Sequence, residues 1–382
     1  MNYLRIARPE VTLSLFDRIL RINWLLVVLL ISLALVGVTM LYSASGGSFE
    51  PYSSRHATRF AFTLGLMLVL ALVDIRIWMA LAYPVYALAL ALLIGVEFFG
   101  ETAMGAQRWL NIGPIRLQPS EMMKLALVLA LARYLHAAGE LKQLRDLPVP
   151  LLLIAIPFAL ILKQPDLGTA ILVAAIGAGM IYLAGLGWRI ILSGAVSAAI
   201  GLPLFLAFGL KEYQWRRIRT FLNPEDDPLG SGYHILQSKI ALGSGGVDGK
   251  GFLNGSQSSL NFLPEKHTDF IFTMIGEEFG FLGSVGVLAL YGAVLLVGFY
   301  IAIRCQSMFG RMMASGITIT FGLYVLVNVG MVTGLLPVVG VPLPLISYGG
   351  TVMLAVMIGF ALVMNAHIYR YSVLPTGRSL IL

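Results

Sequence analysis

The sequence predicts an all-α, polytopic integral membrane protein with about ten transmembrane helices. Hydrophobic residues make up 58% of its 382 residues and charged residues only 12%, whereas a soluble globular protein carries roughly a quarter charged residues. The mean hydropathy is +0.86. Length alone would suggest two or three soluble domains, but the number of apolar windows overrides that expectation. We therefore expect a single transmembrane domain over residues 1–382.

Apolar windows long enough to cross about 30 Å of hydrocarbon recur along the chain. Several of them are short or contain Pro and Gly, and their ends are defined to within a few residues. The ten windows are 22–42, 58–73, 77–97, 120–136, 149–163, 168–184, 188–209, 270–303, 309–333 and 350–369. The first is too long for the apolar core of a signal peptide, so we expect it to be retained.

The distribution of Lys and Arg predicts which side of the membrane each segment faces. With the N-terminus in the cytoplasm, inner segments hold thirteen of these residues and the short outer loops hold five. Segments 1–21 and 370–382 are then cytoplasmic, and 210–268 is a large outer loop with a short amphipathic stretch at 233–242. The formal charge of +7 is thus a topology signal, and nucleic-acid binding has no support.

Ionisable side chains crowd the junction of this loop with the next apolar window, in "NFLPEKHTDFIFTMIGEEFGFLG". Thr268 is expected to cap a helix that starts at Asp269, where the helix dipole favours an ionised carboxylate. Such an aspartate could act as a general base or bind a cation. The alternative is a simple helix-capping charge, which is the commoner role for a lone Asp at a helix start. Lys266 and His267 precede it at the outer rim.

Two glutamates lie further along the same window. Glu277 and Glu278 are eight and nine residues beyond Asp269, about 12–14 Å deeper along a helix. Glutamates at that depth are costly and by default functional, and the alternative is a structural partner for a buried cation. Gly276, Gly280 and Gly283 favour close packing of another helix on one face.

A second group of polar residues lies in "GAQRWLNIGPIRLQPSEMMKLALVLALARYL". Ser120 is expected to cap a helix, and Glu121 and Lys124 would share one face of it. An unpaired ammonium among the following apolar residues would be costly, so Glu121 is the candidate partner. The pair could be a structural ion pair or part of a site. Arg108 and Arg116, on the same outer side, suit a phosphate or pyrophosphate.

Two further motifs interrupt the apolar pattern. In "KQPDLGTA", Lys163 and Asp166 flank a Pro kink, and a turn with a salt bridge is the simplest interpretation. In "GLLPVVGVPLPLISYGGT", three prolines and a Gly pair predict non-helical backbone, which is tolerated at membrane depth only where it is buried or lines a cavity. Ser347 and Tyr348 are its polar residues. All of these polar groups are expected on the outer side of the membrane. Two classes of function remain, a transporter and an enzyme whose substrate is embedded in the membrane.

Other site types find no support in the sequence. The single cysteine, Cys305, excludes an intramolecular disulfide and a multi-cysteine metal site. The five histidines show no metal-binding spacing, and "GSGGVDGKG" does not match a phosphate-binding loop.

Five long motifs resemble the SEDS family (shape, elongation, division, sporulation) of bacterial cell-wall polymerases. They are "GAQRWLNIGPIRLQPSEMMKLAL", "KQPDLGTA", "RTFLNPEDDPLGSGYHILQSKIALGSGG", "GKGFLNGSQSSLNFLPEKHTDFIF" and "LPVVGVPLPLISYGGT". The resemblance spans most of residues 20–370 and is closer to the elongation members than to the division members. Lys266 stands where the family more often has Arg, which keeps the charge.

The resemblance implies ten transmembrane helices in a bacterial cytoplasmic membrane, with both termini cytoplasmic and the active site facing outside. It implies polymerisation of lipid II, the undecaprenyl-pyrophosphate-linked disaccharide pentapeptide, during cell elongation. The implied partners are lipid II and its glycan, a class B penicillin-binding protein, the elongation machinery and membrane lipids. The family's essential Asp corresponds to Asp269, its Glu and Lys to Glu121 and Lys124, and its Ser to Ser347.

On this hypothesis Asp269 deprotonates the acceptor's GlcNAc 4-hydroxyl, which attacks the donor's anomeric carbon with inversion and releases undecaprenyl pyrophosphate. The expected substrate-binding residues are Glu121, Lys124, Arg108, Arg116, Ser347, Lys266 and His267. No organic cofactor is expected, and a divalent cation such as Mg²⁺ or Mn²⁺ is an alternative source of countercharge. The rival functions are a lipid II flippase or other transporter and a non-catalytic scaffold for a transpeptidase.

Overall fold

The structure, a computed structural model, describes residues 13–103, 106–112, 115–139, 141, 143–188, 190, 192–194, 199, 215, 219–226, 230–255 and 266–375. Its α-helices are α1 (Leu15–Leu20), α2 (Trp24–Ala44), α3 (Tyr52–Ala71), α4 (Ile75–Phe99), α5 (Pro119–Ala138), α6 (Pro148–Lys163), α7 (Leu167–Leu183), α10 (Ser231–Ser244), α12 (Ile271–Arg304), α13 (Met308–Val332) and α14 (Gly350–Ile368). Two short 3₁₀ turns, η1 (Leu144–Asp146) and η2 (Pro224–Asp226), are also described.

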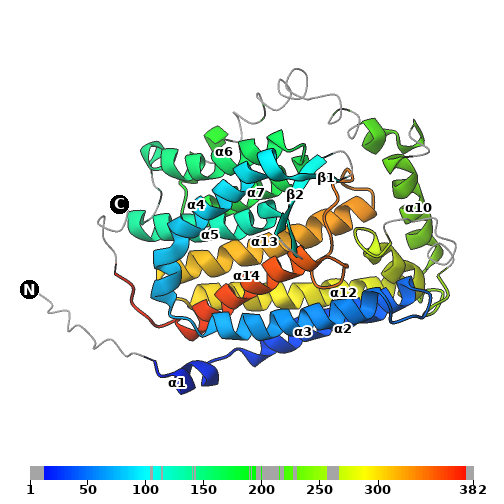
Figure 1. Ribbon diagram of the computed structural model, residues 1–382, viewed down its shortest axis with the longest axis horizontal. Coiled ribbons are helices and arrows are strands. Elements are labelled where there is room, and N and C mark those ends of the chain that lie inside the picture. Colours follow the sequence, from blue (N-terminus) through cyan, green and yellow to red (C-terminus); the bar gives the residue numbers. More distant parts are fainter. Residues whose placement is uncertain are drawn as a thin grey trace, which may run out of the picture.

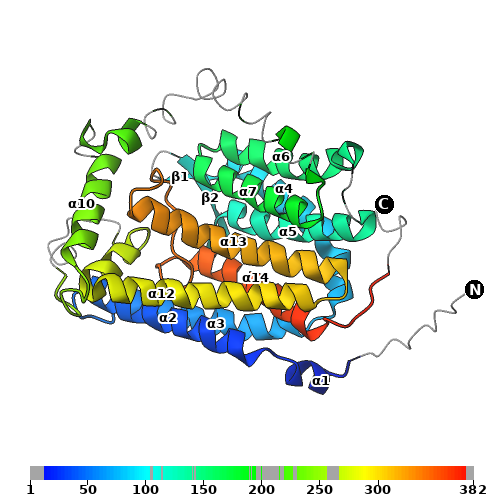
Figure 2. The same ribbon diagram turned by 180° about the vertical axis from the view of Figure 1, so that it is seen from behind.

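The long helices run side by side along the longest axis of the molecule (Figure 1, Figure 2). The central helix is α13, which packs against α5, α7, α12 and α14. Around it, α4 packs on α5, α3 packs on α14, and α2 packs on α3 and α12. The first and last described segments, α1 and the chain after α14, both lie at the end of the bundle opposite α10 (Figure 1).

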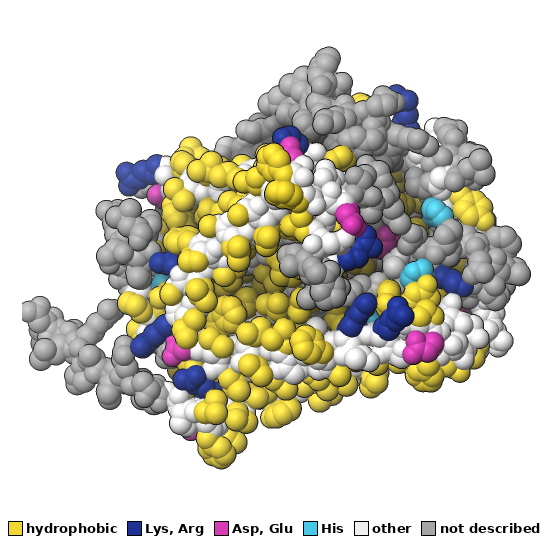
Figure 3. All heavy atoms as spheres, viewed as in Figure 1, with side chains coloured by type: hydrophobic (Ala, Val, Ile, Leu, Met, Phe, Trp, Pro, Cys, Tyr) yellow, Lys and Arg dark blue, Asp and Glu magenta, His cyan; other side chains and the backbone are white. Residues whose placement is uncertain are grey.

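The all-α membrane architecture is confirmed. Within the described residues, five helices are long and apolar enough to cross a membrane, namely α2, α4, α12, α13 and α14, and α6 and α7 are shorter apolar helices. Nine of the ten expected windows coincide with a helix, and 188–209 lies mostly outside the described residues. Hydrophobic side chains cover much of the face seen in Figure 3, as a lipid-facing surface requires.

A small antiparallel sheet lies between α4 and α5, which the sequence did not lead us to expect. Its strands are β1 (Glu101–Ala103), β2 (Ala106–Ile112) and β3 (Ile115–Leu117), and they pair in the order β1-β2-β3. Asn111 pairs with Arg116 across the second hairpin. The sheet therefore gives Arg108 and Arg116 a fixed place beside the start of α5.

Helix α12 is broken at Gly280, whose φ of +64° is left-handed. The segment 245–251 after α10 lies against this break and forms backbone hydrogen bonds on both sides of it, from the Lys250 N–H to the Glu277 carbonyl at 3.0 Å and from the Phe281 N–H to the Gly246 carbonyl at 2.9 Å. A Cβ at Gly280 would lie 2.4 Å from backbone atoms of this segment. The glycine is required by a close backbone approach as well as by its φ.

The amphipathic stretch predicted at 233–242 is confirmed as α10. The helix is fixed to the bundle by the Ser238 hydroxyl, which lies 2.8 Å from the Thr273 hydroxyl and donates to the Val332 carbonyl at 2.9 Å. A Cβ at Gly276 would contact Leu242 of α10. Gly276 and Gly280 of α12 therefore pack against α10 and the segment that follows it, whereas the neighbour of Gly283 is Phe279 of α12 itself.

Candidate active site

Asp269 lies in a turn, residues 266–270, immediately before α12. The expected cap at Thr268 is wrong, because α12 starts at Ile271 with Phe270 as its N-cap and no side-chain cap bond. The three carbonyls from residue 267 to 269 instead each accept a hydrogen bond from outside the turn. The donors are the Tyr348 N–H to His267 at 2.9 Å, the Ser347 hydroxyl to Thr268 at 2.5 Å and the Asn328 amide to Asp269 at 2.8 Å.

The segment 341–348 supplies two of these three donors, and its backbone is held by a hydrogen bond within the segment and by contacts from α3 and α12. Ser347 accepts a hydrogen bond from the Leu343 N–H at 2.8 Å, and His56 of α3 lies 3.0 Å from the Leu345 carbonyl. Tyr291 of α12 donates to the Pro344 carbonyl at 2.6 Å. Most of the segment is buried, as expected for non-helical backbone at membrane depth.

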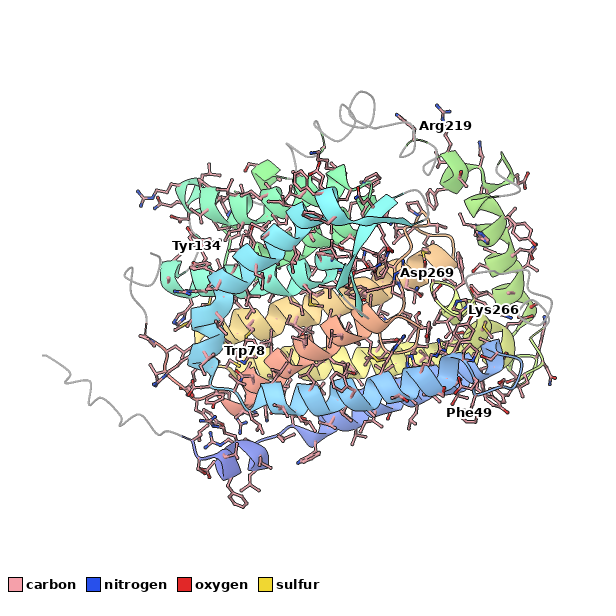
Figure 4. All side chains as sticks on the ribbon, in the orientation of Figure 1. Phe49, Trp78, Tyr134, Arg219, Lys266 and Asp269 are labelled. Atoms are coloured by element: carbon pink, nitrogen blue, oxygen red, sulfur yellow. The ribbon has the colours of Figure 1, made fainter. Side chains whose placement is uncertain are left out.

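The Asp269 carboxylate lies against a second turn of the same loop. Gly340 has a φ of +72°, and a Cβ placed on it would be 3.4 Å from Oδ2 of Asp269. Asp269 is half-buried and lies at the end of the bundle near α10, away from Trp78 and Tyr134 (Figure 4). The carboxylate is therefore placed at one end of the bundle, on a backbone that is fixed by the 341–348 segment and by α13.

An aromatic group forms the rim next to this turn. The rings of His267 and Tyr52 stack with centroids 4.5 Å apart, and Tyr348 meets Tyr52 edge-on at 5.1 Å. The guanidinium of Arg59 lies 4.9 Å from the centroid of the Tyr348 ring. Burial lowers the pKa of the neighbouring Lys266 ammonium from its ordinary value. Through His267, these contacts connect the turn that holds Asp269 to the N-terminal half of α3.

The expected ion pair between Glu121 and Lys124 is present, with 2.7 Å between the Lys124 Nζ and the Glu121 Oε1. The hydroxyl of Tyr324 in α13 donates to the other oxygen of Glu121, and the ammonium lies 4.4 Å from the centroid of the Tyr324 ring. The pair lines a cavity of about 20 Å³, which holds about one water molecule. Ser120 is not the cap, because α5 starts one residue earlier, at Pro119.

The motif "KQPDLGTA" forms the expected turn, but its two charged residues do not pair with each other. Lys163 pairs with Glu97 of α4, and Asp166 caps α7 through the Thr169 N–H. The guanidinium of Arg108 lies 3.8 Å from Asp166. Of the two predicted phosphate-binding arginines, Arg108 is thus directed toward a carboxylate.

Arg116 lines an open groove of about 490 Å³ between α3, the sheet and α14. Its lining residues are Arg59, Phe62, Thr63, Trp109, Arg116, Leu117, Gly350, Thr351 and Leu354. Arg116 also pairs with exposed Glu101 at 3.2 Å and lies over the Trp109 ring. The groove therefore combines two guanidinium groups with apolar and aromatic walls.

Glu277 and Glu278 have structural partners. Lys250 lies 2.7 Å from Glu277, and the hydroxyl of Ser43 in α2 donates to Glu278. Both carboxylates are only 1% exposed and lie just before the break at Gly280. Of the two alternatives for Glu277, the geometry matches a structural partner for a cation, although that cation, Lys250 of the 245–251 segment, is partly exposed and only the carboxylate is buried.

The structure thus brings Asp269, His267 and Ser347 into one hydrogen-bonded unit and places the Glu121–Lys124 pair next to it along α13. Sequence reasoning missed Tyr52, Arg59, Tyr324 and Asn328. The last two were open to prediction, because polar side chains within an apolar helix are costly and by default functional. Within the described part of the chain, no group of three or more His, Cys, Asp or Glu side chains could hold a metal ion.

Comparisons with known proteins agree with this architecture. The chain is 44% identical to the peptidoglycan glycosyltransferase MrdB of Escherichia coli K12, over 90% of this chain and 93% of that protein. It is 37% identical to the probable peptidoglycan glycosyltransferase FtsW of Geobacter metallireducens, over 89% and 93% of the two chains.

Two solved structures are also similar. One is a chain of a peptidoglycan synthase complex that coordinates polymerization and crosslinking, with a TM-score of 0.79 and 35% identity over 92% of this chain and 98% of that one. The other is the rod shape determining protein RodA of Thermus thermophilus, with a TM-score of 0.69 and 31% identity over 92% and 98%.

The sequence pattern of the cell cycle protein family FTSW_RODA_SPOVE matches residues 23–372, and the chain belongs to this family. The resemblance seen in the sequence motifs is confirmed. With its apolar helices, the chain is a multi-pass protein of the inner membrane.

Proposed function

We propose that this protein is a peptidoglycan glycosyltransferase that polymerises lipid II, with Asp269 as the general base. The observation that carries the proposal is the fixed Asp269 turn, whose three successive carbonyls are held by Tyr348, Ser347 and Asn328. A base held in this way can be kept within reach of one hydroxyl group of a bound sugar. The names of the similar proteins support the same reaction.

The groove beside α3 suits the lipid-linked pyrophosphate of the donor. Arg59 and Arg116 both line it, and guanidinium groups match phosphate oxygens in charge and geometry. Phe62 and Leu354, from α3 and α14, add apolar surface that suits the first part of a polyprenyl chain. The Arg59–Tyr348–Tyr52–His267 contacts lead from this groove to the Asp269 turn.

In the proposed reaction, the acceptor's 4-hydroxyl loses its proton to Asp269 and its oxygen attacks the donor's anomeric carbon. The new bond joins that carbon to the acceptor oxygen. The bond to the pyrophosphate breaks, and undecaprenyl pyrophosphate leaves with both electrons of that bond. A carboxylate is a weak base, so positioning and stabilisation of the leaving charge must supply much of the rate.

Several groups remain candidates for stabilising that charge. We keep Glu121, Lys124 and Arg108 as candidate substrate-binding residues, although in this structure each is engaged with a neighbouring side chain or carbonyl. A divalent cation would bring positive charge to the leaving group. With no carboxylate cluster among the described residues, it would take most of its ligands from the pyrophosphate itself, as Mg²⁺ commonly does.

The same proposal places Asp269 and α10 on the outer side of the inner membrane and both termini in the cytoplasm. The described chain supports this arrangement, because α1 and the chain after α14 lie together at the opposite end from α10 (Figure 1). A class B penicillin-binding protein would cross-link the strands. A solved relative belongs to a complex that coordinates polymerization with crosslinking.

A reconstitution experiment separates this function from the rival functions. Purified protein is reconstituted in two sets of liposomes, one with labelled lipid II in the inner leaflet only and one with it in both leaflets. The amounts of glycan polymer and of translocated lipid II are measured in the same samples. A polymerase makes glycan from outer-leaflet lipid II and does not move it across. Translocation without polymer would establish a transporter, and neither activity in the presence of an active transpeptidase would establish a scaffold.

A further inference from the structure

Asn328 is a buried amide on α13 that contacts the backbone of the Asp269 turn and takes no part in the proposed bond changes. It is 0% exposed, and its Nδ2 donates to the Asp269 carbonyl at 2.8 Å and to the Val341 carbonyl at 2.7 Å. Its Oδ1 has no hydrogen-bond partner among the described residues. Since both contacts are to carbonyl oxygens, the nitrogen must face them and the orientation of the amide is fixed.

The two hydrogen bonds that Asn328 donates join parts of the site that are distant in the sequence. Asp269 belongs to the turn before α12, and Val341 begins the segment 341–348. The Asn328 side chain therefore connects the Asp269 turn to the 341–348 segment. The same segment also holds the turn through the Ser347 hydroxyl, which donates to the Thr268 carbonyl. An aliphatic side chain of similar size could supply neither donor.

The neighbouring turn of α13 carries a second contact to the site. Tyr324 precedes Asn328 by four residues, so the two side chains share one face of the helix, about 5–6 Å apart at their Cβ atoms. Tyr324 donates to Glu121 and lies under the Lys124 ammonium. A single face of α13 therefore sets the spacing between the Glu121–Lys124 pair and the backbone of Asp269.

We propose that Asn328 is a positioning residue for glycosyl transfer, acting through the Asp269 carbonyl and not through the substrate. The inference rests on the proposed function. If the amide is lost, the Asp269 turn is no longer tied to α13, and the carboxylate shifts relative to the acceptor hydroxyl. A displacement of about 1 Å at a reacting group can lower the rate about 10²-fold.

The chain contains a matched control at the far end of the bundle. Asn365 in α14 is also 0% exposed, and its Nδ2 donates to the Ala71 carbonyl at 2.9 Å and to the Val73 carbonyl at 2.5 Å. Its Oδ1 also lacks a partner among the described residues. Asn365→Ala therefore removes the same number and type of hydrogen bonds from an equally buried amide, far from Asp269.

The test compares kcat and KM for lipid II polymerisation in Asn328→Ala, Asn365→Ala and wild type. The kcat values are normalised to the amount of folded protein, which is measured by thermal melts. We expect Asn328→Ala to lose roughly 10²-fold in kcat with little change in KM. Asn365→Ala should lower the melting temperature by a similar amount and keep its kcat. Asn328→Leu, which keeps a similar size without any donor, should lose as much kcat as the Ala variant.

An unchanged kcat in Asn328→Ala or Asn328→Leu would overturn the inference, as would an equal loss of kcat in Asn365→Ala. Should Asn328→Ala not yield folded protein, Asn328→Ser is measured instead. It keeps one hydroxyl donor, so its kcat should be reduced but above that of Asn328→Leu, and wild-type kcat would again overturn the inference. Wild-type protein that makes no polymer would instead overturn the proposed function.

Discussion

The Lys124 ammonium lies 2.7 Å from a Glu121 oxygen, and the two side chains are only 2% and 5% exposed. A buried ion pair is easily damaged by removing one partner, because the other charge then stays buried and unpaired. The pair therefore allows the structural and the functional interpretations to be separated by stability and activity measurements on the same variants.

We expect Lys124→Met to lower the free energy of unfolding by about 3–5 kcal/mol, because Glu121 is left without its cation. The double variant Glu121→Gln, Lys124→Met removes both charges and should recover most of the stability. If the pair takes part in the reaction, the double variant will be folded yet inactive toward lipid II. Polymerisation at the wild-type rate by the double variant would reduce the pair to a structural role.

The groove predicts an effect on substrate binding. Arg116→Ala should raise the KM for lipid II about tenfold, since a hydrogen bond to a charged group contributes about 1.5–3 kcal/mol. Arg145→Ala, at an exposed position at the opposite end of the bundle, is the control and should leave KM unchanged. Initial rates of polymer formation over a range of lipid II concentrations measure both. Equal KM values for the two variants would remove Arg116 from the donor site.

The break in α12 predicts a contrast between two glycines of one helix. Gly280→Ala puts a Cβ 2.4 Å from the backbone of the 245–251 segment at a left-handed φ, so we expect a loss of at least about 2 kcal/mol in stability. Gly286→Ala meets nothing within 4 Å and should be neutral or slightly stabilising. Thermal melts in one detergent compare them. Similar melting temperatures would mean that the segment does not dock on the break.

Much of the fold was predictable because the apolar windows are long and their composition admits few alternatives. Sequence ranges for α13 and α14, for example, agree with the structure to within a residue or two. The sheet was missed because β1 and β3 have only three residues each, too short for an alternating pattern to stand out. The break at Gly280 was missed because its spacing from Gly276 and Gly283 is also that of a helix-packing face, and glycines are tolerated within a helix.

The residues that make up the site were predictable from the sequence, but the contacts between them were not. Asp269, Glu121 and Lys124 were found from charge in an apolar setting. The cap at Thr268 failed because Ser347, 79 residues away, takes the Thr268 carbonyl and holds the turn outside the helix. The pairing of Asp166 with Arg108, and of Lys163 with Glu97, also depends on tertiary contacts that local spacing does not encode.

The central claim is that the Asp269 carboxylate accepts the proton in glycosyl transfer. The most direct measurement is the rate of polymer formation from labelled lipid II by purified Asp269→Asn, compared with wild type at equal folded protein. The amide keeps the size of the side chain and removes its basicity, so we expect a loss of about 10²–10⁴-fold with a melting temperature near that of wild type. Polymer formation by Asp269→Asn at the wild-type rate would contradict the account.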